Sequence, residues 1–334
     1  MFKGMQQVAL ALAVTGITAF GSAHAADTKE LNFCIISTES SQNLKSMWDP
    51  FLAEMSARTG MKINAFFAPD YAGIIQGMRF NKVDVAWYGN KSAMEAIDRA
   101  GGEIFAQTVA ANGDPGYWSL LIVRNDSPIS SVDDMLKNAK NLTFSNGDPN
   151  STSGYLVPGY YVFAKNNVEP AKVFKRTLNA SHEVNALSVA NGQADVATFN
   201  TEAMDRLQIT NPAKAAQLKV IWKSPLIPAD PIVWRKNLPE DAKKKVHDFF
   251  ANYGANEKEL AVLAGLKWGK FRASNDDQLL PIRQLELFKQ RSQISADSTF
   301  DAVQKQAKIK EIDASLEKLN VRMDALAKKV ASAK

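Results

Sequence analysis

The chain has 334 residues, with 40 lysines and arginines against 35 aspartates and glutamates and a formal net charge of +5. The basic residues are spread without a block of five or more like charges, which argues against a nucleic-acid-binding protein. A single cysteine, Cys34, excludes an intramolecular disulfide, and three scattered histidines argue against a zinc enzyme. We therefore expect no metal and no cofactor. Cys34 lies in the apolar run 33–36 and is expected in the core.

The first residues have the pattern of a secretory signal peptide. Lys3 supplies a positive charge, an apolar run covers residues 8–20, and Ala23 and Ala25 form an A-x-A cleavage site. The run is short for a membrane span of about 20 residues, so we expect cleavage after residue 25 rather than anchoring. No later segment is apolar for long enough to cross a bilayer, and the mature protein is expected to be soluble.

Short apolar runs alternate with helix-like segments along the rest of the chain. The first series predicts strands at 31–37, 62–68, 83–88 and 117–124, with helices at 44–59 and 72–80. The second series predicts strands at 142–145, 174–178 and 195–199, with helical segments at 155–165 and 182–190. This alternation is typical of βαβ units and a mainly parallel sheet.

A short internal similarity favours two lobes of like topology. The run Val-Asp-Val-Ala-Trp-Tyr at 83–88 resembles Ala-Asp-Val-Ala-Thr-Phe at 194–199. Each run follows a helix-like segment and a polar turn, and each is followed closely by an asparagine. So short a similarity can arise by chance, but the alternating pattern around both copies supports a real correspondence.

The pattern changes beyond residue 218. A strand is predicted at 219–223, and Pro225, Pro228 and Pro231 then follow in quick succession. Because proline fixes φ and lacks an N–H, we expect an extended crossover here, which returns the chain from the second lobe to the first. A helix is predicted at 239–253, with a proline in its first turn.

The C-terminal tail carries a heptad pattern, in which apolar residues recur at steps of three and four. These residues are Ile309, Ile312, Leu316, Leu319, Met323, Leu326 and Val330. Such a seam indicates a helix that packs along another surface, either its own lobe or the tail of a second copy in a homodimer. The predicted organisation is lobe one at 26–120 plus 226–296, lobe two at 121–225, and a C-terminal helix at 297–334.

The sharpest local feature is the polar run Asn-Gly-Asp-Pro-Asn-Ser-Thr-Ser-Gly at 146–154, between a predicted strand and a helix-like segment. A helix start presents unpaired N–H groups and partial positive charge, and Ser151, Thr152 and Ser153 add three hydroxyl groups there. Gly154 would let a ligand approach the backbone closely. The run favours an anion site, although one Ser or Thr would also serve as an ordinary N-cap. Pro158 should kink this helix or delay its start.

Five stretches closely resemble the periplasmic phosphonate-binding proteins of phosphonate ABC transporters: 36–40, 64–73, 85–90, 146–154 and 223–231. The resemblance covers nearly the whole mature chain and is looser at 168–173 and in the C-terminal helix. It implies an α/β, two-lobed type II periplasmic binding protein fold with hinge crossovers, a ligand cleft and a C-terminal helical extension. It also implies a periplasmic solute-binding protein, not an enzyme, that delivers its ligand to an inner-membrane ABC permease.

The resemblance assigns five residues to the phosphonate end of the ligand. The anion would lie at the helix start formed by Ser151, Thr152 and Ser153, with Tyr71 and His182 at the same end. A phosphonate has three acceptor oxygens, and hydroxyls, backbone N–H groups and a phenol can surround it with donors.

Three further residues are implied at the other end of the cleft. Tyr117 matches a cleft tyrosine, and Glu202 and Asp230 match carboxylates that hold the amine of 2-aminoethylphosphonate. A ligand ammonium would neutralise carboxylates whose burial is otherwise costly, so a ligand without an amine would be disfavoured.

Each of these residues also has an ordinary explanation, as a helix-start aromatic, a helix cap, a turn carboxylate, a surface histidine or a core tyrosine. Phosphate, phosphite and simple alkylphosphonates are the alternative ligands. A phosphonate hydrolase is an alternative function, against which count the missing phosphate-binding loop, nucleophile elbow and metal-ligand cluster. A ligand-sensing domain of a membrane receptor is another, and the same fold would serve it.

Overall fold

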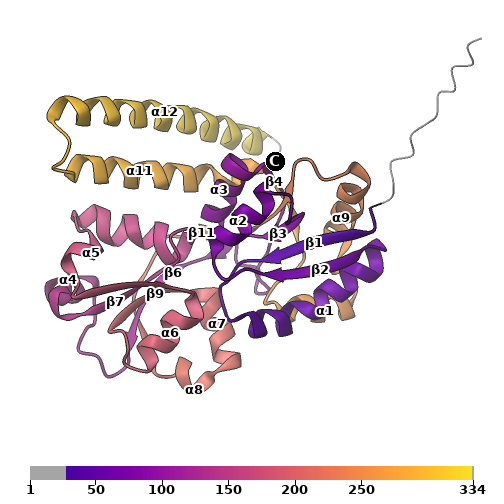
Figure 1. Ribbon diagram of the computed structural model, residues 1–334, viewed down its shortest axis with the longest axis horizontal. Helices are drawn as coiled ribbons and strands as arrows, with labels where there is room; N and C mark the ends of the chain where they lie inside the picture. Colours follow the sequence, from indigo (N-terminus) through magenta and orange to yellow (C-terminus); the bar gives the residue numbers. More distant parts are fainter. Residues whose placement is uncertain (1–27, 333–334) are drawn as a thin grey trace, which may run out of the picture.

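The computed structural model describes residues 28–332, so the predicted signal peptide at 1–25 lies outside the described residues. The described chain forms two α/β lobes side by side, with two long C-terminal helices across one face (Figure 1). Each lobe is built around one of the two large sheets. Within residues 28–332 no helix is both long and apolar enough to span a membrane.

The first lobe contains a six-stranded sheet of order β13-β4-β12-β3-β1-β2. Three strands run parallel to one another: β1 (Glu30–Ile35), β2 (Lys62–Phe67) and β3 (Val85–Trp87). β12 (Pro231–Arg235) lies antiparallel between β3 and β4 (Gly102–Gln107), and β13 (Arg272–Ala273) pairs with the far side of β4. The helices of this lobe are α1 (Ser41–Thr59), α2 (Tyr71–Arg79), α3 (Asn90–Ala100), α9 (Glu240–Asn252) and α10 (Glu257–Gly265).

Aromatic side chains fill much of the first-lobe core. The ring of Trp48 lies 5.5 Å from that of Phe33, 5.6 Å from that of Trp87 and 5.2 Å from that of Trp268. These contacts hold α1 against β1 and β3, the strands whose carboxyl ends lead into the cleft. Cys34 is buried in the same core as predicted, and burial raises the pKa of its thiol to about 12.

The second lobe contains a five-stranded sheet of order β10-β6-β9-β7-β8. Three strands run parallel: β7 (Thr143–Gly147), β8 (Arg176–Ala180) and β9 (Val196–Asn200). β6 (Ser119–Arg124) is antiparallel to both β9 and β10 (Leu218–Lys223). The α-helices are α4 (Val132–Asn138), α5 (Pro170–Val173), α6 (His182–Ala190), α7 (Thr201–Thr210) and α8 (Pro212–Ala215).

The crossover region differs from the sequence prediction. Residues 225–231 were expected to be extended and irregular, but Pro231 begins β12, in the middle of the first sheet. Proline is tolerated as the first residue of a strand. The strand predicted at 117–124 is divided into β5 (Gly116–Tyr117) and β6, because the backbone of Trp118 bonds to Thr201 instead of a neighbouring strand. Both sheets are therefore mixed. The strand that follows each crossover, β12 in the first sheet and β6 in the second, runs antiparallel to its neighbours.

β5 forms a small antiparallel pair with β11 (Ile227–Pro228), and this pair connects the two lobes. A side chain at Gly116 would collide with the carbonyl oxygen of Ile227, so the two chain segments can approach this closely only with glycine. The lobe boundaries that the sequence predicts, near residues 120 and 225, fall beside this pair.

The helical segment after β7 is wound more widely than an α-helix. It consists of π-helical turns at Thr152–Leu156 and Gly159–Phe163 on either side of Pro158. It begins at Thr152, three residues before the predicted start at 155. Pro158 lacks the N–H that an α-helix would bond to the fourth residue before it. The proline therefore lies where the winding changes, and it does not delay the start of the helix.

Two antiparallel helices, α11 (Leu280–Ala296) and α12 (Ala302–Ser332), end the chain (Figure 1). Arg291 Nε donates to Asp313 Oδ1 at 2.7 Å, and Gln284 Nε2 donates to Asn320 Oδ1 at 2.7 Å. Of the heptad residues, Ile312 and Leu316 are buried, and Ile309, Leu319, Met323 and Leu326 are half-buried. The side chain of Val330 lies outside the described part. The tail thus packs on α11 of its own chain, and the homodimer stays a prediction.

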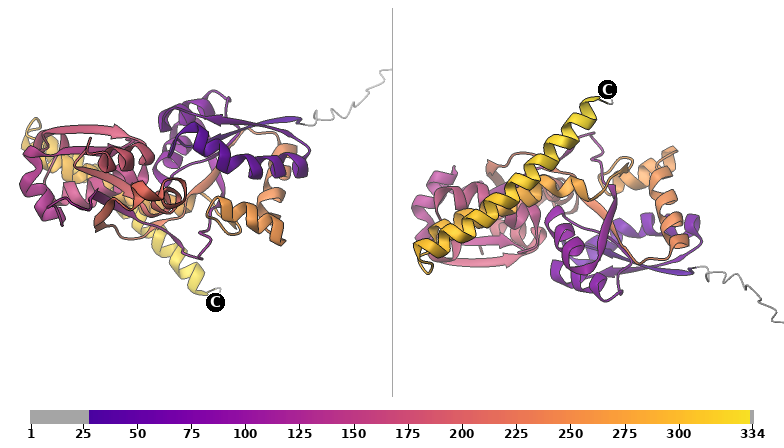
Figure 2. Two further views of the ribbon diagram at one scale, coloured as in Figure 1. Left: turned by 90° about the horizontal axis from the view of Figure 1, so that it is seen from below. Right: turned by 90° about the horizontal axis from the view of Figure 1, so that it is seen from above.

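α11 contacts both lobes. On the first lobe, Arg283 pairs with Asp98 of α3 at 2.7 Å. On the second lobe, the ring of Phe288 stacks on Tyr160 at 5.9 Å, and Lys289 Nζ lies 4.7 Å from the centre of the Tyr155 ring. α12 begins over the second lobe, and its C-terminal end projects away from it (Figure 2). The hairpin is therefore a third link between the lobes, beside the two crossovers.

Candidate anion-binding cleft

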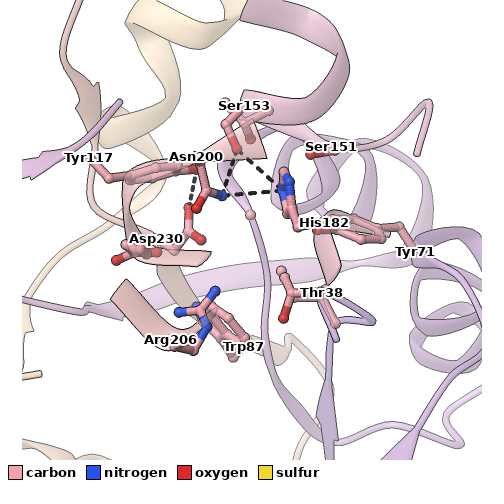
Figure 3. A pocket seen from close by; sticks show the side chains of 14 residues that line it. Thr38, Tyr71, Trp87, Tyr117, Ser151, Ser153, His182, Asn200, Arg206 and Asp230 are labelled. Atoms are coloured by element: carbon pink, nitrogen blue, oxygen red, sulfur yellow. Dashed lines mark hydrogen bonds between the residues drawn. The ribbon is translucent and has the colours of Figure 1, made fainter. Parts of the chain in front are cut away.

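All eight residues predicted from the sequence line one pocket between the lobes, which Figure 3 shows from close by. Tyr71, Tyr117, Ser151, Thr152, Ser153, His182, Glu202 and Asp230 lie there. The sequence prediction did not include Ile36, Thr38, Trp87, Gly89, Asn200 and Arg206, which line the same pocket. The pocket is enclosed by the carboxyl ends of strands and the first turns of helices from both lobes, which is where open α/β sheets bind ligands.

The Ser-Thr-Ser run forms one polar wall of the pocket. Ser151 is the N-cap of the π-wound segment, and its Oγ accepts from the N–H of Gly154 at 2.9 Å. Thr152 Oγ1 accepts from the backbone N–H of Lys91 at 2.8 Å, a contact between lobes. Ser153 Oγ accepts from Asn200 Nδ2 at 3.0 Å. Ser151 is therefore both a helix cap and a residue that lines the pocket. The N-cap explanation and the anion-site explanation of this run are compatible.

Gly154 serves packing in a way that the sequence did not indicate. A Cβ at Gly147 would lie 2.5 Å from the Cα of Gly154, and a Cβ at Gly154 would lie 2.8 Å from Ser151 Oγ. The end of β7 and the start of the helix thus cross almost in backbone contact. This close crossing holds the three hydroxyl residues at the cleft.

His182 is a buried residue of the cleft, with 3% of its surface exposed, so the alternative of a surface histidine is wrong. It is the first residue of α6, after the N-cap Ser181. Burial, helped by the charge of Arg206, lowers the pKa of His182 to about 3, so the imidazole is neutral at physiological pH. Its Nε2 lies 3.2 Å from Asn200 Nδ2.

The two tyrosines are buried and face the carboxylates. The hydroxyl of Tyr117 donates to Asp230 Oδ1 at 2.9 Å. Burial, followed by the charges of Asp230 and other carboxylates, raises the pKa of both Tyr71 and Tyr117 well above the ordinary value. Both phenols therefore keep their protons and can donate hydrogen bonds.

Glu202 and Asp230 bring negative charge to the other side of the pocket. Asp230 is buried and Glu202 half-buried. Desolvation, followed by the charge of Glu202, raises the pKa of Asp230 well above its usual value. Desolvation also raises the pKa of Glu202, while the nearby Arg206 opposes the shift. Two carboxylates in each other's field favour a cation that can neutralise them.

Arg206 adds a cation that sequence reasoning missed. It lies one helical turn after Glu202 on α7, and its guanidinium Nε is 2.7 Å from Oε1 of Glu39 in the first lobe. The side chains of both partners are largely buried, at 6% and 9% exposure. The i, i+4 spacing from Glu202 was the available signal, because residues so spaced lie on one helix face.

The lobes are closed on one another around this pocket. The Ser40 N–H and the Asn43 side-chain amide each donate to the Glu183 carboxylate at 2.6 Å, and the Tyr71 N–H donates to Asp148 at 3.2 Å. The remaining cavity has a volume of about 10 Å³, on the order of what one water molecule requires. A larger solute can enter only if the lobes separate.

Residues 33–279 match the family model of periplasmic substrate-binding proteins of phosphonate ABC transporters. The chain belongs to this family. It is 63% identical over 310 residues to the phosphonates-binding periplasmic protein of Escherichia coli K12, an alignment that covers 92% of this chain and 91% of the relative. Relatives in this family are substrate-binding components of transporters and not enzymes.

Solved structures agree with this family. A binding protein component of an ABC phosphonate transporter from Pseudomonas aeruginosa superimposes with a TM-score of 0.89 at 69% identity, covering 90% of this chain and all of that chain. A Prochlorococcus marinus protein in complex with methylphosphonate superimposes with a TM-score of 0.68 at 23% identity, covering 77% and 97%, and shows the fold alone. The fold is the type II periplasmic binding protein fold that the resemblance implied.

Proposed function

We propose that this periplasmic binding protein captures phosphonates in the cleft, with 2-aminoethylphosphonate as the preferred ligand, and delivers them to an inner-membrane ABC permease. The family supports the coarse function. The preference for an aminophosphonate rests on one observation: the pocket combines a wall of hydrogen-bond donors with a pair of carboxylates whose pKa values are raised.

The phosphonate group fits the wall formed by Ser151, Thr152, Ser153, Tyr71 and His182. This wall offers hydroxyls, a phenol, a neutral imidazole and the start of a helix, so it binds an anion through hydrogen bonds. The π winding adds to the available donors, because the first backbone bond back to the cap joins the Leu156 N–H to Ser151 O at 3.1 Å. The N–H groups before Leu156 lie at the positively polarised end of the helix.

The amine fits the opposite side. When both are ionised, Glu202 and Asp230 bring two negative charges against the single guanidinium of Arg206, which already pairs with Glu39. An ammonium group would bring the missing positive charge and restore favourable ionisation of the two carboxylates. Tyr117 holds Asp230 in place and completes this side.

Transport requires that ligand binding be coupled to closure. The contacts between lobes, including Thr152 with Lys91 and Glu183 with Ser40, form only when the cleft is shut. The cavity of about 10 Å³ is too small for a phosphonate, so the lobes would close around the ligand at a slightly wider angle. The ligand would stabilise that closed, liganded form, which would dock on the permease. The signal peptide would direct export and be cleaved after residue 25, which leaves the mature protein in the periplasm. Pairing of the C-terminal helices would make the protein a homodimer.

Calorimetric titration of ligand-stripped protein tests the ligand. We expect 2-aminoethylphosphonate to bind at least about 100-fold more tightly than methylphosphonate or phosphate, since a charged group left unpaired in the cleft costs about 3 kcal/mol. The variants Glu202→Gln and Asp230→Asn should narrow this margin, because each keeps the shape and removes the charge. If the wild-type protein bound phosphate equally well, it would be a general oxyanion binder. Glu202 and Asp230 would then not contribute to the choice of ligand.

A further inference from the structure

We propose that Asn200 is a positioning residue that sets His182 and Ser153 as hydrogen-bond donors toward the ligand. The proposal deepens the proposed function, since it rests on an oxyanion binding at this wall. It concerns the direction of the donors, which decides whether an oxyanion meets hydrogen atoms or lone pairs.

The orientation of the Asn200 amide follows from its helix. Asn200 is the N-cap of α7, and its Oδ1 accepts from the N–H of Ala203 at 2.6 Å. The amino group must therefore point the other way, where Nδ2 lies 3.0 Å from Ser153 Oγ and 3.2 Å from His182 Nε2. An amide amino group has two hydrogens and no lone pair to offer, so both neighbours have to be acceptors.

This requirement fixes the tautomer of His182. A neutral imidazole has one N–H and one bare nitrogen, and Nε2, which accepts from Asn200, is the bare one. The proton consequently resides on Nδ1. That atom is buried and has no hydrogen-bond partner among the described residues, and the ring lines the pocket beside Ser151 and Ser153 (Figure 3). A ligand oxygen would provide the acceptor that this N–H lacks.

Ser153 is directed by the same amide. Its Oγ receives one hydrogen of Asn200, so the hydroxyl proton is left to donate. The alternative acceptor, His182 Nε2, is 3.5 Å from Ser153 Oγ, and its single lone pair is taken by the nearer Asn200. The hydroxyl is then free to point at a ligand oxygen, and one asparagine presents two donors.

The first lobe uses an asparagine in a corresponding place. Asn90 follows β3 as Asn200 ends β9, and its Nδ2 donates to Pro228 O at 2.7 Å and to Asp230 Oδ1 at 3.2 Å. These are the asparagines that follow the two similar sequence runs at 83–88 and 194–199. Each lobe therefore has a buried amide that orients a pocket side chain.

Nitrogen-15 NMR of the histidine rings tests the tautomer without any ligand. The chain after residue 25 contains only His182 and His247, and His247 is exposed on α9, so His247→Gln assigns the two sets of signals. At neutral pH we expect His182 to show a protonated Nδ1 and an unprotonated Nε2. An Nε2–H tautomer or an imidazolium would overturn the proposal.

The variant Asn200→Asp tests the consequence for binding. Aspartate keeps an acceptor for the Ala203 N–H and is itself a good N-cap, but it replaces the two donated hydrogens by lone pairs. We expect the Nδ1–H signature to be lost and 2-aminoethylphosphonate to bind at least about tenfold more weakly, because Ser153 and His182 would turn their hydrogens toward the new carboxylate. Asn256→Asp, at the N-cap of α10 far from the cleft, is the matched control.

The outcomes separate the two proposals. If Asn200→Asp keeps the Nδ1–H tautomer and binds within twofold of the wild type, Asn200 does not position the donors. If the wild-type protein shows the expected tautomer but binds no 2-aminoethylphosphonate, the proposed ligand fails while the tautomer assignment holds.

Discussion

The guanidinium of Arg206 lies 2.7 Å from the carboxylate of Glu39, although 167 positions of sequence separate them. Arg206 belongs to α7 of the second lobe and Glu39 to the segment after β1 in the first. The ion pair is therefore made only when the lobes close. Among residues 28–332, Glu202 and Asp230 have no ion-pair partner, and the charge of Arg206 offsets only part of the rise in their pKa values.

We predict that Arg206→Met weakens binding of 2-aminoethylphosphonate by about 100-fold or more. Removing one partner of a buried ion pair costs about 3–5 kcal/mol because the other charge stays unpaired. Calorimetric titration measures the loss. The double variant Arg206→Met with Glu39→Gln should regain part of the affinity, and Arg124→Met, which breaks an exposed pair with Asp126, should change nothing. Unchanged affinity in Arg206→Met would contradict this role.

The raised pKa values of Glu202 and Asp230 predict how stability depends on pH. Between the unfolded and the folded pKa, the folded protein holds protons that the unfolded chain has released, so stability is present at low pH and is lost as pH rises through this window. Glu202→Gln with Asp230→Asn should therefore raise the Tm of the ligand-free protein at pH 8 by about 2–4 °C or more. This increase in Tm should become smaller toward pH 4, where the carboxyl groups of the wild-type protein are protonated in the folded state.

Thermal unfolding of both proteins across this range measures the effect. The difference between them cancels the contribution of His182, whose lowered pKa acts with the opposite sign: stability is lost as pH falls below about 6.5. A double variant less stable than the wild type at pH 8 would mean that the carboxylates are satisfied without a ligand.

We predict that Gly147→Ala damages both folding and binding. The new Cβ would lie 2.5 Å from the Cα of Gly154, so the Ser-Thr-Ser run must move away from the cleft. Overpacking of this kind costs about 1–3 kcal/mol, and affinity should fall at least tenfold. Gly265→Ala, where a Cβ meets nothing within 4 Å, is the control. Denaturant unfolding and titration report the two effects, and a crystal structure with an unmoved loop would refute the explanation.

The heptad seam of α12 predicts the state of association. If paired tails form a homodimer, the mature chain should have twice the monomer mass in solution, and a chain that ends at residue 296 should be monomeric. Light scattering during size-exclusion chromatography measures both. A monomeric mature chain would show that the seam serves only the packing on α11, where Ile312 and Leu316 are already buried.

Features that depend on neighbouring residues were predictable from the sequence. The alternating pattern indicated β1, β2, β3 and the strands of the second lobe, and the Ser-Thr-Ser run indicated the polar wall. Features that depend on distant residues were not. Glu39 gives no local sign that Arg206 is its partner, and β12 was hidden because a strand that begins with proline resembles a crossover.

The pocket residues divide in the same way. The resemblance identified eight residues that the structure brings together, and it left out Asn200 and Arg206. Asn200 was visible only as an asparagine that follows a repeated run. Its importance comes from the direction of its amide, which the N–H of Ala203 determines and which no sequence pattern records.

The helix α11 has a consequence for how the cleft moves. It is fixed to the first lobe by Arg283 and to the second by Phe288 and Lys289, so rotation of one lobe against the other has to strain or slide one of these contacts. The helical hairpin would therefore oppose changes in the angle between the lobes. Whatever holds the hairpin, a second copy or a transporter subunit, would change the resting angle of the cleft and with it the affinity for the solute.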